Sequence, residues 1–169
     1  FGGGYFYLDN NDNAIVIGNN KIKCMPTEYV EPKPDIYSLS PIWQSDNIVE
    51  LVTGETNNSL YSVSSLWSDS LNDYYWGILS GKINSVDGSI QANAYIVMLK
   101  IDNTEASLGN CETRIIDFLE LPNQYINNVS AQDENGFFYC VTNGFPQTGF
   151  LYSFYYDVKE ELIKTKWKT

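Results

Sequence analysis

Short strands that begin with glycine and aromatic residues recur in this chain, and the recurrence constrains its fold more than any other feature. The first is Gly4-Tyr5-Phe6-Tyr7-Leu8, and the second is Gly136-Phe137-Phe138-Tyr139-Cys140. The second is followed by another aromatic strand that ends in an aspartate, Phe150-Leu151-Tyr152-Ser153-Phe154-Tyr155-Tyr156-Asp157. The apolar run from Ala94 to Asp102 also ends in an aspartate. Strand-turn-strand units that recur along a chain indicate a repeat architecture.

Runs of β-branched and aromatic residues, separated by turn residues, predict about a dozen strands at a spacing of roughly 8–12 residues. The clearest turn signals are Asn19-Asn20, Asn135-Gly136 and Lys159-Glu160-Glu161. Asparagine and glycine suit tight hairpins because they tolerate positive φ. Helix signals are nearly absent, so even residues 48–53 are predicted as a strand, and residues 95–101 as a strand of the fully buried kind. The fold class is therefore all-β: a sandwich, a barrel or a propeller.

The unit with the clearest pattern runs from Arg114 to Trp167. It reads as strands at 114–121 and 126–131, an Asn-Gly hairpin, two more strands, and a last segment that contains Lys164-Thr165-Lys166-Trp167. This stretch resembles the blades of bacterial quinoprotein-like β-propellers, the type that binds pyrroloquinoline quinone, although the turn before the last segment is Lys159-Glu160-Glu161 in place of Thr-Gly. Near the N-terminus, two consecutive predicted strands resemble the same blade pattern: Gly3-Gly4-Tyr5-Phe6-Tyr7, followed by Ala14-Ile15-Val16-Ile17.

The resemblance implies a β-propeller of about three to four four-stranded blades, each of about 40–50 residues. Both ends of the sequence read as strand or turn, so we expect residues 1–169 to be one all-β repeat region within a longer propeller chain. In such blades Asp157 and Trp167 would dock neighbouring blades and would have no catalytic role. A β-sandwich of the jelly-roll kind is the alternative, since it also suits an acidic, aromatic-rich chain.

The charge of the chain limits its partners. The formal net charge is −11 and only 10 residues are Lys or Arg. Nucleic-acid affinity comes largely from cations that neutralise phosphates, so neither a nucleic acid nor an anionic membrane surface is expected as a partner. No apolar run approaches the length of a membrane-spanning helix, so membrane insertion is not expected either.

The sequence contains no histidine, which removes the commonest general base and the commonest transition-metal ligand. A Ser-His-Asp or Cys-His site cannot be built from this chain alone. Cys24, Cys111 and Cys140 are far apart and none forms a Cys-x-x-Cys motif. Cys24 and Cys140 lie in apolar strand patterns and are expected to be buried, whereas Cys111 lies in a polar segment where a disulfide to either of them is an open alternative.

Oxygen-bearing side chains alternate at Asp9, Asn11 and Asn13, as they do in loops that bind calcium. Ala14 and Asn20, however, occupy the positions where an EF-hand loop has glycine and a bidentate glutamate. We therefore expect a polar hairpin turn here, and calcium is the one cofactor that the sequence leaves open.

Aromatic residues suggest a second candidate site. Tyr74, Trp76 and Trp43 are the candidates for a platform on which sugar rings would stack, and the alternative is that these rings pack in the core. Together these observations predict a non-catalytic propeller module, periplasmic or secreted, that binds a protein or a glycan through the loops between its strands. The alternative is a quinoprotein-like oxidoreductase with its site in the central channel.

Overall fold

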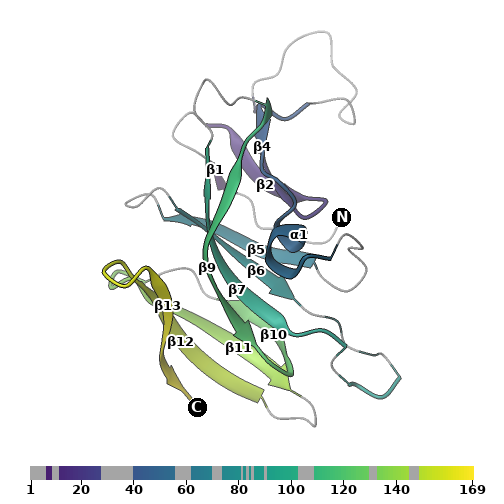
Figure 1. The fold of residues 1–169 in the computed structure, drawn as a ribbon, viewed down its shortest axis with the longest axis vertical. Coiled ribbons are helices and arrows are strands. Elements are labelled where there is room, and N and C mark those ends of the chain that lie inside the picture. The colour runs from purple at the N-terminus through teal and green to yellow at the C-terminus, as the bar shows by residue number, and fades with distance from the viewer. Residues whose placement is uncertain are drawn as a thin grey trace.

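The structure is a computed structural model, and it describes residues 7–8, 12–27, 40–55, 62–69, 74–80, 82, 84, 86–89, 91–102, 109–129, 133–144 and 149–169. Within these ranges most residues lie in β-strands, which are arranged in three sheets. The sheets are stacked along the long axis of the molecule, with the N-terminal sheet at the top of the view and the C-terminal sheet at the bottom (Figure 1). The predicted all-β class is confirmed. A sandwich of two sheets, the alternative, does not describe this stack of three.

The N-terminal sheet has five short strands in the order β1-β2-β3-β4-β8. They are β1 (Tyr7–Leu8), β2 (Ala14–Gly18), β3 (Lys21–Met25), β4 (Trp43–Gln44) and β8 (Gly109–Asn110). The predicted hairpin between β2 and β3 is confirmed, because Asn19 and Asn20 have φ angles of 55° and 59°. β8 pairs in parallel with β4 and comes from a segment between strands of the middle sheet. No strand was predicted there, because the segment around Cys111 is polar.

The middle sheet has the order β5-β6-β7-β9, and every neighbouring pair in it is antiparallel. Its strands are β5 (Ser62–Asp69), β6 (Tyr74–Ser80), β7 (Ala94–Ile101) and β9 (Thr113–Leu121). The buried character predicted for β7 is confirmed, since all of its side chains except Tyr95 and Lys100 are buried. A strand can bury both of its faces only when other layers cover both sides of its sheet.

The C-terminal sheet is an up-and-down meander of four consecutive strands, β10-β11-β12-β13. They are β10 (Gln124–Val129), β11 (Phe138–Gly144), β12 (Gly149–Asp157) and β13 (Leu162–Lys168). The unit predicted from Arg114 was therefore wrong at its start, because β9 pairs with β7 in the middle sheet. The turn at Pro122-Asn123, where Asn123 has φ 56°, carries the chain from one sheet to the next.

Residues 48–53, predicted as a strand, form the helix α1 (Ile48–Thr53). Asn47 caps its N-terminus, since its side-chain oxygen accepts hydrogen bonds from the backbone N–H groups of Val49 (3.1 Å) and Glu50 (3.3 Å). Gly54 ends the helix with φ 72°, and its N–H donates to the Glu50 carbonyl. Ile48 and Val49 are buried, so tertiary packing and both caps outweigh the β-propensity of this sequence.

Replacing Asn47 with alanine is expected to lower the free energy of unfolding by about 1 kcal/mol, the usual cost of losing an N-cap side chain. Asn47→Asp keeps an acceptor oxygen in the same place and is expected to fold with nearly the stability of the native chain. Urea unfolding followed by circular dichroism measures both variants. Equal losses in the two would show that the cap does not stabilise α1.

Two separate hydrophobic cores lie on opposite sides of the middle sheet. The first joins it to the N-terminal sheet and to α1, and its buried members include Ile15, Ile22, Trp43, Ile48 and Leu99. The second joins it to the C-terminal sheet and includes Trp76, Ile96, Phe138, Phe154 and Ile163. The middle sheet is therefore the shared layer on which the other two are assembled. No helix in the described part of the chain is long and apolar enough to cross a membrane.

Candidate functional site

The three aromatic residues predicted as a platform do not form one surface: the rings of Tyr74 and Trp76 both contact Tyr156 at the second core, whereas Trp43 lies across the middle sheet from them. Trp43 is 5% exposed and belongs to the first core, where its ring contacts Tyr75 edge-on with centroids 6.2 Å apart. Trp76 is fully buried in the second core, on the other side of the middle sheet, with its ring centroid 4.6 Å from that of Phe138. The alternation of a strand explains this placement, because Tyr75 and Trp76 must face opposite sides of β6.

Tyr74, the third of these residues, is half-buried beside Tyr156, with ring centroids 5.6 Å apart. Burial is the main cause that raises the pKa of Tyr156 to about 12, and the neighbouring Tyr74 adds to it. Tyr74, Arg114 and Glu161 also line a recess of about 90 Å³ between β9 and the turn before β13. A recess of this size is below the range of ligand pockets, so we assign these rings a packing role.

The predicted calcium ligands lie mostly outside the described residues. Asp9 and Asn11 belong to that part of the chain, whereas Asn13 is half-buried and immediately precedes β2. Within the described ranges, no group of three or more His, Cys, Asp or Glu side chains is placed to hold a metal ion. Calcium binding at this loop stays a prediction from the sequence.

None of the three cysteines forms a disulfide, and all three side chains are buried. Cys24 and Cys111 lie in the first core and Cys140 in the second, so Cys140 lies across the middle sheet from the other two. The burial predicted for Cys24 and Cys140 is confirmed. Cys111, in the polar segment between β8 and β9, is buried as well, and the disulfide that the sequence left open is not formed. Burial raises the pKa of the Cys140 thiol to about 12 and also raises that of Cys111, so neither thiol is activated as a nucleophile.

Asp157 organises the hairpin between β12 and β13. Its Oδ1 accepts hydrogen bonds from the backbone N–H groups of Lys159 (3.0 Å) and Glu160 (3.3 Å), and its Oδ2 contacts Lys164 Nζ at 2.9 Å. Lys164 also pairs with Glu160 at 2.8 Å. The bond from Lys164 is the largest cause that lowers the pKa of Asp157. These contacts hold its own turn together, and among the contacts described none joins Asp157 to the neighbouring sheet.

The lowered pKa of Asp157 predicts a pH-dependent contribution to stability. A carboxylate with a pKa below its ordinary value of 3.8 stabilises the fold at higher pH, and this contribution is lost as the pH falls through the folded-state value. The stability difference between the native chain and Asp157→Asn should therefore be largest near neutral pH and shrink in acid. Thermal unfolding across this pH range measures it, and a difference that is independent of pH would contradict the prediction.

Trp167 lies on the outer face of the C-terminal sheet, the face turned away from the second core. It pairs with Ser153, which in turn pairs with Tyr139, so the three side chains form a row across the sheet. The Tyr139 and Trp167 rings are 6.1 Å apart across the small Ser153, and Trp167 is 38% exposed. The role predicted for Trp167, docking a neighbouring blade, is untested by these contacts, because no element in the described part of the chain packs on this face.

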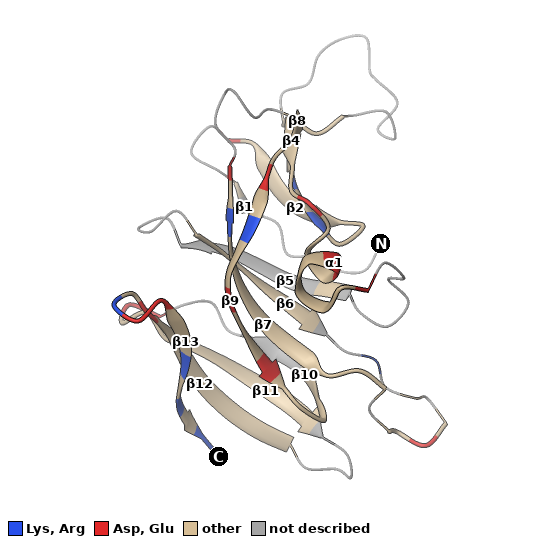
Figure 2. Ribbon diagram, viewed as in Figure 1, with Lys and Arg blue, Asp and Glu red and all other residues tan. Residues whose placement is uncertain are grey.

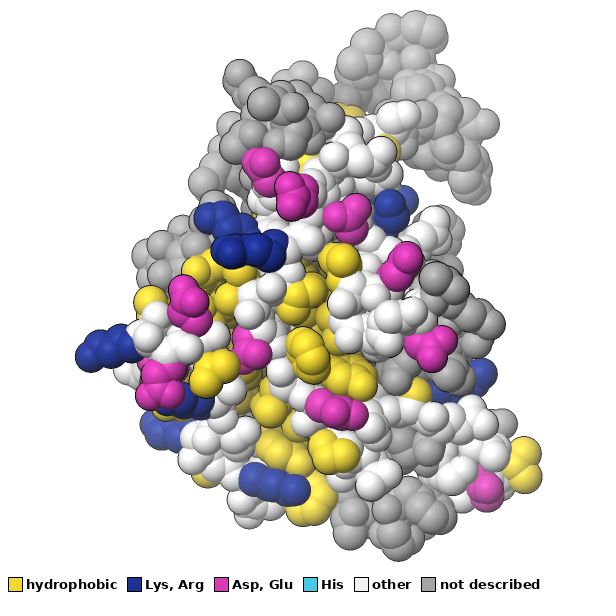
Figure 3. Space-filling model, in the orientation of Figure 1, with side chains coloured by type: hydrophobic (Ala, Val, Ile, Leu, Met, Phe, Trp, Pro, Cys, Tyr) yellow, Lys and Arg dark blue, Asp and Glu magenta, His cyan; other side chains and the backbone are white. Residues whose placement is uncertain are grey.

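Hydrophobic side chains also gather on the face shown in Figure 3. They form a band that runs over β9 and the strands behind it toward the C-terminal sheet. Phe118 on β9 is 45% exposed and meets Tyr95 of β7 with ring centroids 5.9 Å apart, while Leu51 of α1 is 42% exposed. The edge strand β9 contains acidic residues (Figure 2), and Asp and Glu side chains interrupt the hydrophobic band (Figure 3), which suits an edge strand that must not pair with another chain.

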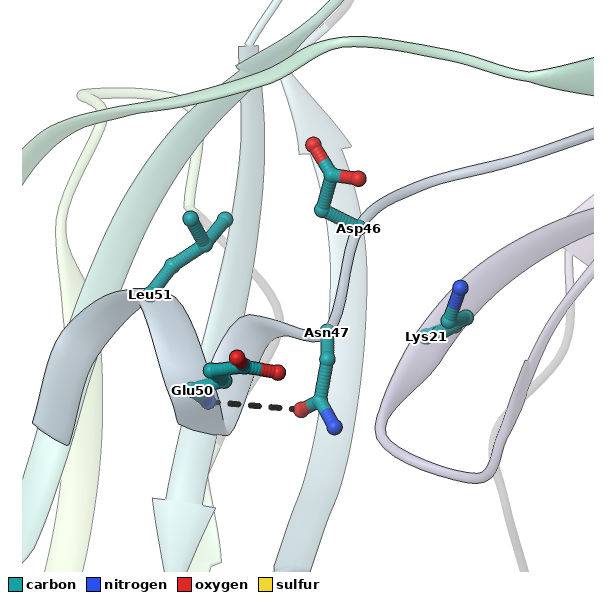
Figure 4. A pocket seen from close by; sticks show the side chains of 5 residues that line it. All are labelled: Lys21, Asp46, Asn47, Glu50 and Leu51. Atoms are coloured by element: carbon teal, nitrogen blue, oxygen red, sulfur yellow. Dashed lines mark hydrogen bonds between the residues drawn. The ribbon is translucent and has the colours of Figure 1, made fainter. Parts of the chain in front are cut away.

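A pocket with a volume of about 390 Å³ lies between the β2–β3 hairpin and α1. It is lined by Lys21, Asp46, Asn47, Glu50 and Leu51 (Figure 4). Lys21, on β3, stands across the opening from Asp46 and Glu50, and the side-chain nitrogen of Asn47 points away from α1. The volume lies within the range of small-molecule sites, but the lining is polar where most such pockets are apolar.

Backbone contacts hold two of these side chains in place. Asp46 Oδ2 accepts a hydrogen bond from the Thr113 backbone N–H (3.1 Å), while the Asp46 N–H donates to Thr113 Oγ1 (2.8 Å). Asn47 is fixed as the cap of α1. The pocket therefore presents one ammonium group, two carboxylates and an amide, and of these the carboxylate of Asp46 and the amide of Asn47 are held in place by the backbone. Such a set can both donate and accept hydrogen bonds, and it contains no nucleophile with a general base beside it.

The sequence did not indicate this pocket, because its residues come from three segments that meet only in the fold. The one local signal was Asn47 followed by Glu50 at the third helical position, which marks a helix start. When the chain is compared with protein-family models, with curated proteins and with solved structures, none of the three comparisons finds a match.

Proposed function

We propose that these 169 residues supply three blades of a β-propeller that acts as a non-catalytic, glycan-binding module. The observation that supports the propeller fold is the stack of three sheets, which pack face to face through two separate cores. Propeller blades assemble by face-to-face packing of four-stranded antiparallel sheets, and the middle and C-terminal sheets are of this kind, whereas the N-terminal sheet has a fifth strand that pairs in parallel. The strands of the C-terminal sheet, consecutive along the chain, have the up-and-down order of such a blade.

The polar pocket of Figure 4 supports a glycan as the ligand. Sugar hydroxyls donate to carboxylates and accept from ammonium and amide groups, and the lining provides both kinds of partner. Leu51, 42% exposed, adds apolar surface at the rim for the C–H groups of a sugar ring. The pocket lies between the turn of the β2–β3 hairpin and the N-terminus of α1. This position fits a module that recognises its ligand through the segments between its strands. A glycan ligand in turn fits the periplasmic or secreted location that we propose.

The test is calorimetric titration of the chain with a panel of neutral and acidic oligosaccharides. We expect binding by at least one of them, with its affinity lowered by about tenfold or more in Lys21→Met and in Glu50→Gln, since hydrogen bonds to charged groups are lost. Lys82→Met and Glu55→Gln are the matched controls, because both residues are exposed outside the pocket. Equal affinity in pocket and control variants would refute the site. Chemical change of the bound sugar would refute a non-catalytic role.

A further inference from the structure

Basic residues are few in this acidic chain, and they are concentrated in the hairpin of β12 and β13. Four of the 10 Lys and Arg residues lie there: Lys159, Lys164, Lys166 and Lys168. Three of them belong to β13, the edge strand of the C-terminal sheet, and Figure 2 shows Lys residues along this strand. Asp157 and Glu160 form ion pairs with Lys164. Among the described residues, no ion pair involves Lys166 or Lys168, so β13 carries two positive charges that are not neutralised by a close carboxylate.

Each of these two lysines lies over an aromatic ring. Lys166 Nζ is 3.8 Å from the ring centroid of Phe137, and Lys168 Nζ is 3.7 Å from that of Phe150. The face of an aromatic ring attracts an ammonium group, so both charges are held close to the sheet. Both side chains nevertheless remain exposed. Lys166, Trp167 and Lys168, which we call the β13 strip, thus present two positioned ammonium groups beside an indole ring.

Trp167 gives the strip an apolar surface. The register of β12 and β13 shifts at Ser153, which makes Lys166 an extra residue in β13 and explains why Lys166 and Trp167 both lie on the outer face. The Trp167 ring is 38% exposed and its centroid is 6.1 Å from that of Tyr139. Between them lies Ser153, whose buried Oγ has no hydrogen-bond partner in the described part of the chain. A ligand hydroxyl that entered between the two rings would supply this partner.

The charge of the strip favours an anionic ligand, although the chain as a whole has a net charge of −11. Lysine on an edge strand also prevents pairing with another sheet, but that role does not require an indole ring beside it. Asp133 approaches the same face, and its carboxylate already accepts hydrogen bonds from the Tyr139 hydroxyl and the Phe137 N–H, both at 2.9 Å. The strip can therefore pair with external carboxylate groups.

A sugar chain suits the strip better than a nucleic acid does. The apolar face of a sugar ring can stack on an indole, and its hydroxyl groups can pair with a serine or tyrosine hydroxyl. A nucleic acid carries a phosphate at every nucleotide, and its affinity comes from cations that neutralise these phosphates. Two lysines on a chain with a net charge of −11 are too few for that purpose.

We propose that the β13 strip binds an acidic oligosaccharide, with one sugar ring stacked on Trp167 and carboxylate groups paired with Lys166 and Lys168. This inference rests on the proposed glycan-binding function and adds a second site to it. The first site lies between α1 and the β2–β3 hairpin, whereas β13 belongs to the C-terminal sheet. Propeller blades pack through their faces, so an edge strand remains accessible in the proposed fold.

The first test is calorimetric titration of the chain with hexagalacturonic acid, an oligosaccharide of uronic acids. The same oligosaccharide after methyl esterification has lost its charge and is the matched control ligand. We expect the acid form to bind more tightly by about tenfold, since two ion pairs are formed, and its affinity to fall as added salt screens the charges. Equal affinity for the two forms would overturn the proposal.

Variants of the strip identify the residues that bind. The double change Lys166→Gln with Lys168→Gln should weaken binding of the acid form by about tenfold, and Trp167→Ala by about tenfold or more. The matched controls are Lys159→Gln in the same hairpin and Phe118→Ala, an exposed ring on β9. Both controls should bind like the native chain, and circular dichroism confirms that each variant is folded. Equal affinity in the strip variants and the controls would refute the site.

Ser153→Ala tests the buried hydroxyl by itself. If a sugar hydroxyl pairs with Ser153 Oγ, the affinity for hexagalacturonic acid should fall by about threefold or more, the effect of one lost hydrogen bond. Unchanged affinity would overturn the placement of the sugar between the Tyr139 and Trp167 rings.

The pocket variants separate this proposal from the proposed function. If Lys21→Met abolishes binding of the acid form and the strip variants do not, the pocket binds it and the second site is refuted while the function stands. If only the strip variants lose binding, the second site stands and the pocket is refuted. Tighter binding of a thymidine oligonucleotide of equal charge, lost in the same strip variants, would overturn the assignment to a glycan. Self-association of the double lysine variant with unchanged sugar affinity would show that the two lysines only protect the edge.

Discussion

Replacing Trp76 with alanine is expected to lower the free energy of unfolding by about 3–5 kcal/mol, the range for large aromatic side chains removed from a core. Trp76 is fully buried, and its ring lies 4.6 Å from that of Phe138 and 6.2 Å from that of Phe154. The substitution would leave a cavity between the middle and C-terminal sheets, and a close-packed core relaxes only partly into such a space. Guanidinium unfolding followed by far-ultraviolet circular dichroism measures the change.

Phe118→Ala is the comparison within the same sheet. Phe118 is 45% exposed, so its removal should cost less than about 1 kcal/mol. Similar losses in the two variants would contradict the placement of Trp76 in the core. They would also reopen the interpretation of this tryptophan as part of an exposed sugar-stacking platform.

The second large effect is expected from Thr142→Val, in the C-terminal sheet. Thr142 Oγ1 donates a hydrogen bond of 2.6 Å to Gln124 Oε1, and the two residues are 0% and 6% exposed. Valine keeps the shape of threonine but removes the donor, so the buried amide oxygen loses this partner. A buried polar group left unpaired costs about 1–3 kcal/mol. Denaturant unfolding of the variant should show a loss in that range.

The double variant Thr142→Val with Gln124→Met tests the cause of this loss. It removes both polar groups at nearly constant volume, and we expect it to be more stable than the sum of the single changes predicts. Thr142→Ser keeps the hydroxyl and serves as the control, with a loss of about 1 kcal/mol for the missing methyl group. Strict additivity in the double variant would show that the hydrogen bond does not couple the two residues.

Local chemistry was enough to predict parts of this fold. The positive φ angles of Asn19 and Asn20 follow from a residue type that tolerates them, and the burial of β7 follows from its continuous apolar run. The turn at residues 158–161 was also predicted correctly, because charged residues separate two apolar strands there. Each of these features depends on a few consecutive residues.

Features that depend on distant partners were not predictable in this way. The sequence Ile48-Val49-Glu50-Leu51-Val52 has the composition of a strand, and it is helical because Asn47 and Gly54 cap it and because the first core accepts its buried side. β9 and β10 look like a hairpin around Pro122-Asn123, yet they belong to different sheets. The pocket formed by Lys21, Asp46 and Glu50 exists only when the N-terminal sheet packs against α1, so no local sequence pattern predicts it.

The pairing of β8 with β4 has a consequence for the order in which the chain folds. The contact joins Gln44 to Asn110, 66 residues apart, and it closes the N-terminal sheet with a segment that lies between β7 and β9. During synthesis the first sheet stays incomplete until most of the second has emerged. Residues 124–168, by contrast, pair only with near neighbours in the chain. We therefore expect the first two sheets to form as one slow kinetic unit, because distant contacts raise the contact order, and the third to form a faster one.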